Sequence, residues 1–180
     1  MAKSWFSKLF SHAPKPVLEI AGAEANLEDA EVQFNRGMKF ANLAEPERDY
    51  AQAAEWYLKA ADQSHALAQF NLGMMYAHGQ GVARDEVKAT VWFEKAAMLG
   101  DAGAQHQLGM NHQRASKAGM DNHETWIEAY KWYQLAAAQG YKGSHQACES
   151  MALKMTREDV ADGHNRVKCF LAKNANTVHK

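Results

Sequence analysis

The sequence is poor in cysteine, in proline and in long apolar runs. Its 180 residues include two cysteines, Cys148 and Cys169, which form no C-x-x-C motif and no set spaced for metal binding. A disulfide framework is therefore not expected, and a reducing compartment is favoured. The three prolines leave long stretches in which helices can form. No apolar run approaches the roughly 20 residues of a membrane-spanning helix, so none is predicted.

A surplus of charge of either sign is also missing. The 20 lysines and arginines nearly balance the 21 aspartates and glutamates, and the net charge is −1. Without a basic surplus, nucleic acid is not the predicted partner. The hydrophobic fraction of 47% and the charged fraction of 23% are ordinary for a globular protein. A chain of this length can build one full-sized core.

The N-terminal segment lacks the continuous apolar stretch of a signal peptide. Such a stretch spans about 7–15 residues, and here Lys8, His12, Lys15 and Glu19 interrupt every candidate. A cytoplasmic location is therefore predicted.

Residues 1–25 are instead expected to form a basic and aromatic tail. Its large apolar side chains are Trp5, Phe6, Leu9 and Phe10, and the lysines among and around them are Lys3, Lys8 and Lys15. As a short amphipathic helix, the tail could touch an anionic membrane or dock on a partner. Two plainer interpretations are disorder, which is common at termini, and folding back over the first repeat.

Internal repetition is what the sequence has in abundance. The stretches NRGMKFA, NLGMMYA and QLGMNHQ are centred on Gly37, Gly73 and Gly109, which are 36 residues apart. Residues at equivalent positions of the units are called a column. Three further columns have the same spacing: Ala30, Ala66 and Ala102; Gln33, Gln69 and Gln105; Met38, Met74 and Met110. A glycine within a helix costs about 1 kcal/mol relative to alanine. Its recurrence predicts an inner helix that approaches its neighbour closely once in each unit.

Each unit is predicted to contain two helices. The second half of the first unit has apolar residues at i, i+3, i+4, i+7 and i+8, which is one face of an α-helix. The second and third units repeat this spacing. The apolar residues of the three units, in order, are Ala53, Trp56, Tyr57, Ala60 and Ala61; Ala89, Trp92, Phe93, Ala96 and Ala97; and Ala129, Trp132, Tyr133, Ala136 and Ala137. The third set follows the second by 40 residues, so residues 112–124 are expected to hold the four inserted residues in a longer loop.

Helix ends are marked by capping residues. Asp49 with Gln52, and Thr125 with Glu128, are spaced as capping boxes that start a helix. Asp85 occupies the same column as Asp49. Gly100 and Gly140 stand where a helix end favours a left-handed residue. Because the first unit has Ser64 there, its corner is expected to be made differently.

A divergent fourth pair follows Gly140. Residues 144–155 and 156–173 are predicted to be helical, and Thr156 with Asp159 forms a further capping box. Stacked repeats need an atypical end unit that covers the last apolar face. The fold class is therefore predicted to be all-α, an α-solenoid of three helix pairs with a C-terminal capping pair. The repeats are placed at about 26–64, 65–100 and 101–140, with a cap at 141–175, in one domain of residues 26–180.

The second unit, AQFNLGMMYAHGQGVARDEVKATVWFEKAAMLG, closely resembles the Sel-one-like repeat family, which is related to the tetratricopeptide repeat. The first unit departs in lacking the glycine loop, and the third has His112 in place of an aromatic residue. The resemblance covers roughly residues 26–173, and the ending is similar to that of small bacterial members. It implies a right-handed superhelix whose first helices line a concave groove, and a non-catalytic scaffold or adaptor that binds a protein or peptide.

The resemblance also implies which columns face that groove. The contact residues are predicted to be Phe34, Met38, Asn42, Phe70, Met74, His78, His106, Met110 and Arg114. Methionine suits surfaces that accept varied apolar partners, while the polar members would orient the partner at the rim. The alternative is that the methionine column packs between units as core, which is the commoner use of such residues.

No catalytic, metal or cofactor site is predicted. His106 and His112 are six residues apart, off the spacing that places two ligands on one helical face. The loop His78–Val82 lacks the P-loop pattern and no strand precedes it. Some secreted, cysteine-rich relatives have been linked to β-lactam binding or hydrolysis, so a hydrolase is an alternative function. Their paired cysteines and a Ser-x-x-Lys motif are missing here.

Overall fold

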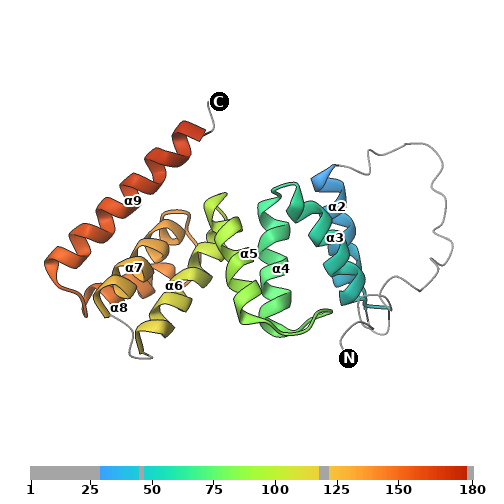
Figure 1. The fold of residues 1–180 in the computed structure, drawn as a ribbon, viewed down its shortest axis with the longest axis horizontal. Coiled ribbons are helices and arrows are strands. Elements are labelled where there is room, and N and C mark those ends of the chain that lie inside the picture. The colour runs from blue at the N-terminus through green and yellow to red at the C-terminus, as the bar shows by residue number, and fades with distance from the viewer. Residues whose placement is uncertain (1–28, 45–46, 118–121, 178–180) are drawn as a thin grey trace, which may run out of the picture.

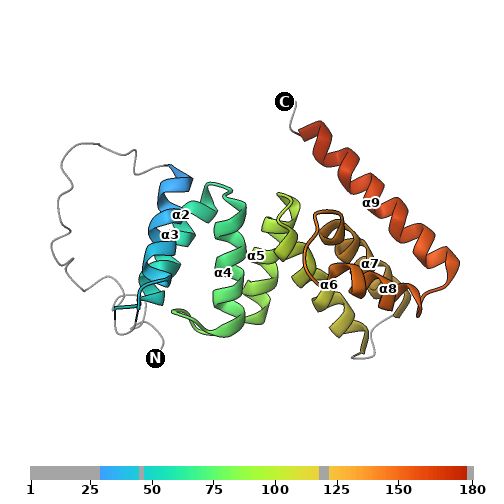
Figure 2. The same ribbon diagram turned by 180° about the vertical axis from the view of Figure 1, so that it is seen from behind.

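The computed structural model describes residues 29–44, 47–117 and 122–177, and in these ranges it contains eight helices and no strand. The helices are α2 (Ala30–Ala41), α3 (Tyr50–Asp62), α4 (Ala66–His78), α5 (Glu86–Met98), α6 (Ala102–Lys117), α7 (Asn122–Ala138), α8 (Ser144–Ala152) and α9 (Arg157–Thr177). Helices α2 to α7 form three consecutive pairs that stand side by side along the molecule (Figures 1 and 2). The predicted all-α solenoid is confirmed.

The repeated glycine lies where the two helices of a pair meet. A Cβ atom added to Gly73 would lie 2.6 Å from Cε1 of Phe93, closer than real side chains approach. The same arrangement recurs in the other units: Gly37 faces Tyr57, and Gly109 faces Tyr133. All three rings are buried. The predicted close approach is therefore made between the inner helix and the ring of its own partner helix.

A column of buried glutamines links neighbouring helices, both within a pair and between consecutive pairs. Gln69 Nε2 donates to the carbonyl oxygen of Ala61 at 2.9 Å, and Gln105 Nε2 donates to that of Ala97 at 3.3 Å. The side-chain oxygens of the first and third members also accept hydrogen bonds. Gln63 Nε2 donates to Gln33 Oε1, and Gln139 Nε2 donates to Gln105 Oε1. These bonds fix neighbouring helices in register, because buried amides are costly when unpaired.

The middle unit breaks this pattern at Leu99. Leu99 holds the position that Gln63 and Gln139 hold in the other units, and in the described structure Gln69 Oε1 is the buried side-chain oxygen without a hydrogen-bond partner. Leu99 is 51% exposed and lines the same surface hollow as Gln69.

Replacing Leu99 by glutamine is therefore expected to stabilise the protein. The new amide would donate to Gln69 Oε1 and raise the free energy of unfolding by about 1 kcal/mol, measured by urea unfolding. The matched control is Leu153→Gln, because Leu153 is an exposed leucine on α8's C-terminal side. It is expected to change the free energy of unfolding by less than about 0.5 kcal/mol. Equal effects of the two substitutions would contradict this explanation.

The corners between units share one backbone conformation. Ser64 has φ 64°, and Gly100 and Gly140 have φ 93° and 75°. The expectation of a different corner in the first unit is wrong, since Ser64 adopts the left-handed conformation that glycine adopts more easily.

Capping residues start most of the helices. Asp49 accepts from the Gln52 amide, Asp85 accepts from the Lys88 amide, and Thr156 and Asp159 cap each other reciprocally. The predicted cap at Thr125 is wrong, because α7 already begins at Asn122.

The four inserted residues of the third unit lengthen its helices. Helices α6 and α7 have 16 and 17 residues, whereas α4 and α5 have 13 each. The longer loop expected over residues 112–124 is therefore mostly helix, and only residues 118–121 of this stretch lie outside the described ranges. The residues that lengthen α7 at its start include Glu124, one of the carboxylates that pair with the last helix.

The C-terminal helices both pack on α7. Helix α9 lies beside α7 in both views (Figures 1 and 2), and its Phe170 ring meets Trp132 edge-on with 5.4 Å between centroids. Farther along, Asn174 Nδ2 donates to the carbonyl oxygen of Met98 in α5. The cap therefore covers the third unit and reaches back to the second.

Arg166 is the main polar link between α9 and α7. Its guanidinium pairs with Glu124 and Glu128 of α7 and with Asp162 of its own helix. Hydrogen bonding to Arg166 lowers the pKa of Glu124. Burial alone would raise the pKa of Glu128, but hydrogen bonds from Lys131 and Arg166 outweigh it and the pKa is lowered.

Replacing Arg166 by methionine is expected to destabilise the protein in a pH-dependent way. Carboxylates with a lowered pKa contribute stability that is complete above their ordinary value of 4.5 and is lost as the pH falls through the folded-state value. The expected loss is about 1–2 kcal/mol at pH 7, and urea unfolding should show it shrinking toward pH 3. A loss that is the same at both pH values would mean that the arginine acts only through packing. Arg157→Met, at an exposed arginine of the same helix, is the control.

Candidate functional site

The predicted contact residues occupy three matching positions on the first helix of each pair. From the N-terminal end of each helix, they are Phe34, Met38 and Asn42 along α2; Phe70, Met74 and His78 along α4; and His106, Met110 and Arg114 along α6. Residues four apart lie on one face of a helix. The three positions nevertheless differ in what they contact.

The first position of each helix packs between units. The Phe34 ring is 9% exposed and stacks on His65, the residue that caps the next unit's first helix, with 4.5 Å between centroids. Phe70 is half-buried beside Gly103 of α6. These rings hold adjacent units together and offer a partner little surface.

His106 has the same packing role in the third unit. Its ring lies 5.2 Å from the rings of Tyr133 and Tyr141, and Nδ1 lies 2.8 Å from Ser144 Oγ. Burial lowers the pKa of His106, so its neutral form is favoured. A half-buried, neutral and hydrogen-bonded imidazole is suited to a structural role.

The second position is the methionine column, which is partly accessible in every unit. Met38 is 36% exposed, while Met74 and Met110 are half-buried and pack against core clusters on one side. Amides of the next unit approach two of the sulfur atoms. Asn71 Nδ2 lies 3.9 Å from Met38 Sδ, and Gln107 Nε2 lies 3.7 Å from Met74 Sδ. Met74 and Met110 therefore each have a side that contacts the core and a side that is open, while Met38 is the most exposed of the three.

The third position is exposed, and in two units it borders a hollow. Asn42 caps the C-terminus of α2, while His78 and Arg114 lie on α4 and α6. The hollow has a volume of about 340 Å³ and lies between α4 and α6. Its lining residues are Met74, Ala77, His78, Arg84, Glu86, Phe93, Gln107, Met110, Asn111 and Arg114. It thus brings together two methionines, a histidine and an arginine of the predicted set.

The charges around this hollow are unevenly compensated. Arg84 pairs with Glu86 at 2.5 Å. Arg114 is exposed, and no carboxylate among the described residues pairs with it. Asn111 Nδ2 donates to Thr90 Oγ1, and a smaller hollow of about 290 Å³ lies beside Asn111 and Arg114.

Sequence reasoning missed several lining residues. Gln107, Asn111 and Arg114 have the i, i+4 and i+7 spacing of one helical face, and this pattern could have identified the two amides. Arg84 and Glu86 flank the start of α5, and their chain positions alone give no sign that they reach the hollow.

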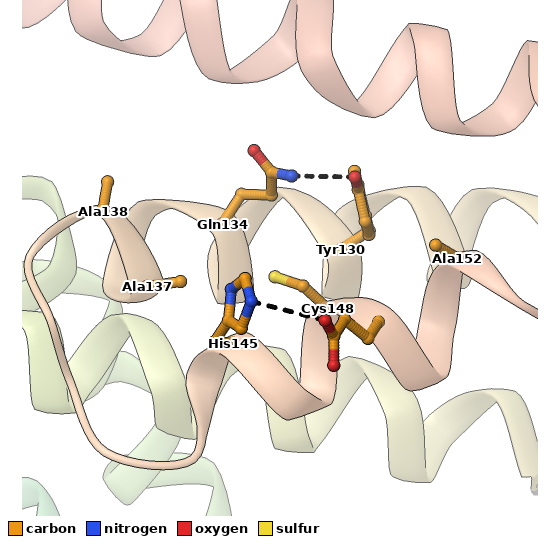
Figure 3. Close-up of a pocket in the computed structure, with 8 residues that line it drawn as sticks. Tyr130, Gln134, Ala137, Ala138, His145, Cys148 and Ala152 are labelled. Carbon is orange, nitrogen blue, oxygen red and sulfur yellow. Dashed lines mark hydrogen bonds and ion pairs between the residues drawn. The ribbon is translucent and has the colours of Figure 1, made fainter.

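A separate hollow, of about 430 Å³, lies between α7 and α8 (Figure 3). Tyr130 and Gln134 line it from α7, with Gln134 Nε2 donating to the tyrosine oxygen at 2.7 Å. Cys148 lines it from α8, and burial raises the pKa of its thiol to about 11. A thiol that stays protonated at neutral pH is a poor nucleophile. The arrangement gives no support to covalent catalysis at Cys148.

Two further tests concern metals and membranes. No group of three or more histidine, cysteine, aspartate or glutamate side chains within the described ranges could hold a metal ion. Among the same residues, no helix has the length and apolar character needed to cross a bilayer. The tail residues Trp5, Phe6, Leu9 and Phe10 lie outside the described ranges.

Comparisons with known proteins agree with this geometry. A family model described as Sel1 repeat matches residues 30–65, 66–101 and 102–141, which together make up more than half of the chain. Comparison with curated proteins gives no significant match.

Two solved structures share the fold. One is a protective antigen present in uropathogenic Escherichia coli strains that displays an SLR fold, with 29% identity and a TM-score of 0.69. The match covers 83% of this chain and 31% of the antigen. The other is a Sel1 repeat protein from Oxalobacter formigenes, with 29% identity, a TM-score of 0.64, and coverage of 86% and 60%. The chain thus spans less than two thirds of the length of either protein.

Proposed function

Because the chain belongs to the Sel1 repeat family, we propose that it is a non-catalytic scaffold that binds a protein or peptide between α4 and α6. Sel1 repeat proteins are typically scaffolds for protein–protein interaction. The observation that carries the proposal is the hollow of about 340 Å³ into which two repeats contribute equivalent side chains, Met74 with His78 and Met110 with Arg114.

The packing around the hollow favours binding by a pre-organised surface. Phe93 forms part of the wall and is 2% exposed, pressed against Gly73 in the same helix pair. Gln107 bridges from α6 to the Met74 sulfur. Since the helices are already fixed, a partner would meet a small ordering cost. The methionines keep enough freedom to fit different apolar side chains.

Photo-crosslinking in cells of the source organism tests this proposal. A benzophenone amino acid is placed at Met110, which lines the hollow, and separately at Val87, which is 75% exposed on α5. We expect a discrete protein adduct from position 110 and a weak, diffuse background from position 87. The same adduct from both positions, or from position 87 alone, would contradict binding between α4 and α6.

A further inference from the structure

We infer that the segment bound between α4 and α6 is an acidic, aliphatic peptide. One of its carboxylates pairs with Arg114, and a neighbouring aliphatic side chain enters the hollow beside Met74 and Met110. This inference rests on the proposed function and adds the chemistry of the partner to it.

Among the described residues that line this hollow, Arg114 is the arginine without a carboxylate partner. Arg84, which lines the same hollow, already pairs with Glu86. Arg166 on α9 likewise pairs with three carboxylates. Arg114 has no such pair in the described part of the chain, and it is exposed at the junction of the two hollows. The forked guanidinium donates two parallel hydrogen bonds to a carboxylate, which gives geometric specificity as well as charge.

The wall beside Arg114 is partly apolar. Met74, Ala77, Phe93 and Met110 line it, and the other lining residues are polar. A cavity of about 150 Å³ is large enough to hold benzene, and this hollow measures about 340 Å³. An aliphatic side chain next to the paired carboxylate would therefore fit, and its burial would add to the charge pair.

The polar groups nearby also favour a single carboxylate. The side-chain amides of Gln107 and Asn111 contact Met74 and Thr90 and carry no charge. Since Arg84 is paired with Glu86, Arg114 is the arginine of the hollow that can pair with an anion. His78 holds the matching position on α4 and is exposed. An anionic membrane is usually held by clusters of about 4–8 basic residues. One arginine without a carboxylate partner, beside a partly apolar hollow, matches a peptide better than a lipid surface.

Peptide selection with a charge-reversed variant tests the inference. Random dodecapeptides displayed on phage are panned against the full chain, against Arg114→Glu and against Arg157→Glu, whose exposed arginine lies on α9. We expect wild type and Arg157→Glu to enrich peptides with aspartate or glutamate next to leucine, isoleucine or methionine. A synthetic copy of the most enriched peptide should bind Arg114→Glu at least about tenfold more weakly and should weaken with added salt. Circular dichroism confirms that both variants are folded.

The outcomes separate this inference from the proposed function. If the enriched peptides lose affinity on Met74→Glu but are neutral or basic, or bind Arg114→Glu equally well, the inference is wrong and the proposed function stands. If no peptide is enriched, or if Met74→Glu has no effect, both are contradicted. Vesicles of equal parts phosphatidylglycerol and phosphatidylcholine are the remaining probe. Sedimentation of the protein with these vesicles that depends on Arg114 would replace the peptide by a membrane surface.

Discussion

Replacing Gly73 by valine is expected to lower the free energy of unfolding by about 3 kcal/mol, the upper part of the range for overpacked cores. The new Cβ would lie 2.6 and 2.7 Å from two carbons of the Phe93 ring and 3.3 Å from the Ala89 carbonyl oxygen. The ring cannot move aside easily because only 2% of Phe93 is exposed. Urea unfolding followed by circular dichroism measures the loss.

Two variants show whether the loss comes from the ring contact. Leu67→Val places valine at a 50% exposed position of the same helix and should cost less than about 0.5 kcal/mol. Phe93→Ala alone should cost about 3–5 kcal/mol. Combined with Gly73→Val it should cost less than the sum, because the valine then fills part of the space left by the ring. If the two losses of free energy of unfolding simply added, the contact with Phe93 would not be the reason for a glycine at position 73.

Replacing Met74 by glutamate is expected to abolish partner binding while the protein stays folded. The carboxylate would stand in the hollow beside Met110, where it removes apolar contact and, on the inference above, repels an acidic partner. Loss of a central contact residue typically costs about 2–4 kcal/mol, which reduces affinity by roughly 30-fold or more. Quantitative mass spectrometry of proteins captured from lysate by wild-type and variant baits measures the change.

The matched control is Met98→Glu. Met98 is 53% exposed on α5 and lines a different hollow, so the same change of charge there should leave the captured partner at its wild-type level. Thermal melting decides between the two interpretations of the methionine column. If Met74→Glu unfolds while Met98→Glu does not, Met74 acts as core and the proposed binding surface is wrong.

Much of the fold could be predicted because the chain repeats. The 36-residue spacing of Gly37, Gly73 and Gly109 fixes equivalent helices in each unit, and apolar periodicity fixes the buried face of each second helix. The errors fell on local signals that tertiary structure overrides. Thr125 has capping chemistry but lies inside α7, and Ser64 adopts a conformation that its residue type disfavours.

The candidate site was less predictable because the partners of its residues come from other units. Periodicity places Phe34 and Met38 on one face of α2. Phe34, however, stacks on His65 and packs between units, so it is not free to contact a partner. Arg84 pairs with Glu86, whereas Arg114 has no carboxylate partner among the described residues. These three residues line one hollow only because of the way α4, α5 and α6 stack. Such differences within a column depend on three-dimensional neighbours, which one sequence does not display.

Methionine oxidation footprinting shows whether the partner binds between α4 and α6. Free protein, and protein bound to the partner that the wild-type bait captures, are oxidised under identical conditions, and sulfoxide is measured at each methionine by mass spectrometry. We expect slower oxidation of Met74 and Met110 in the complex and an unchanged rate at Met98. Protection of Met98 with no change at Met74 and Met110 would place the partner on another surface and contradict binding between α4 and α6.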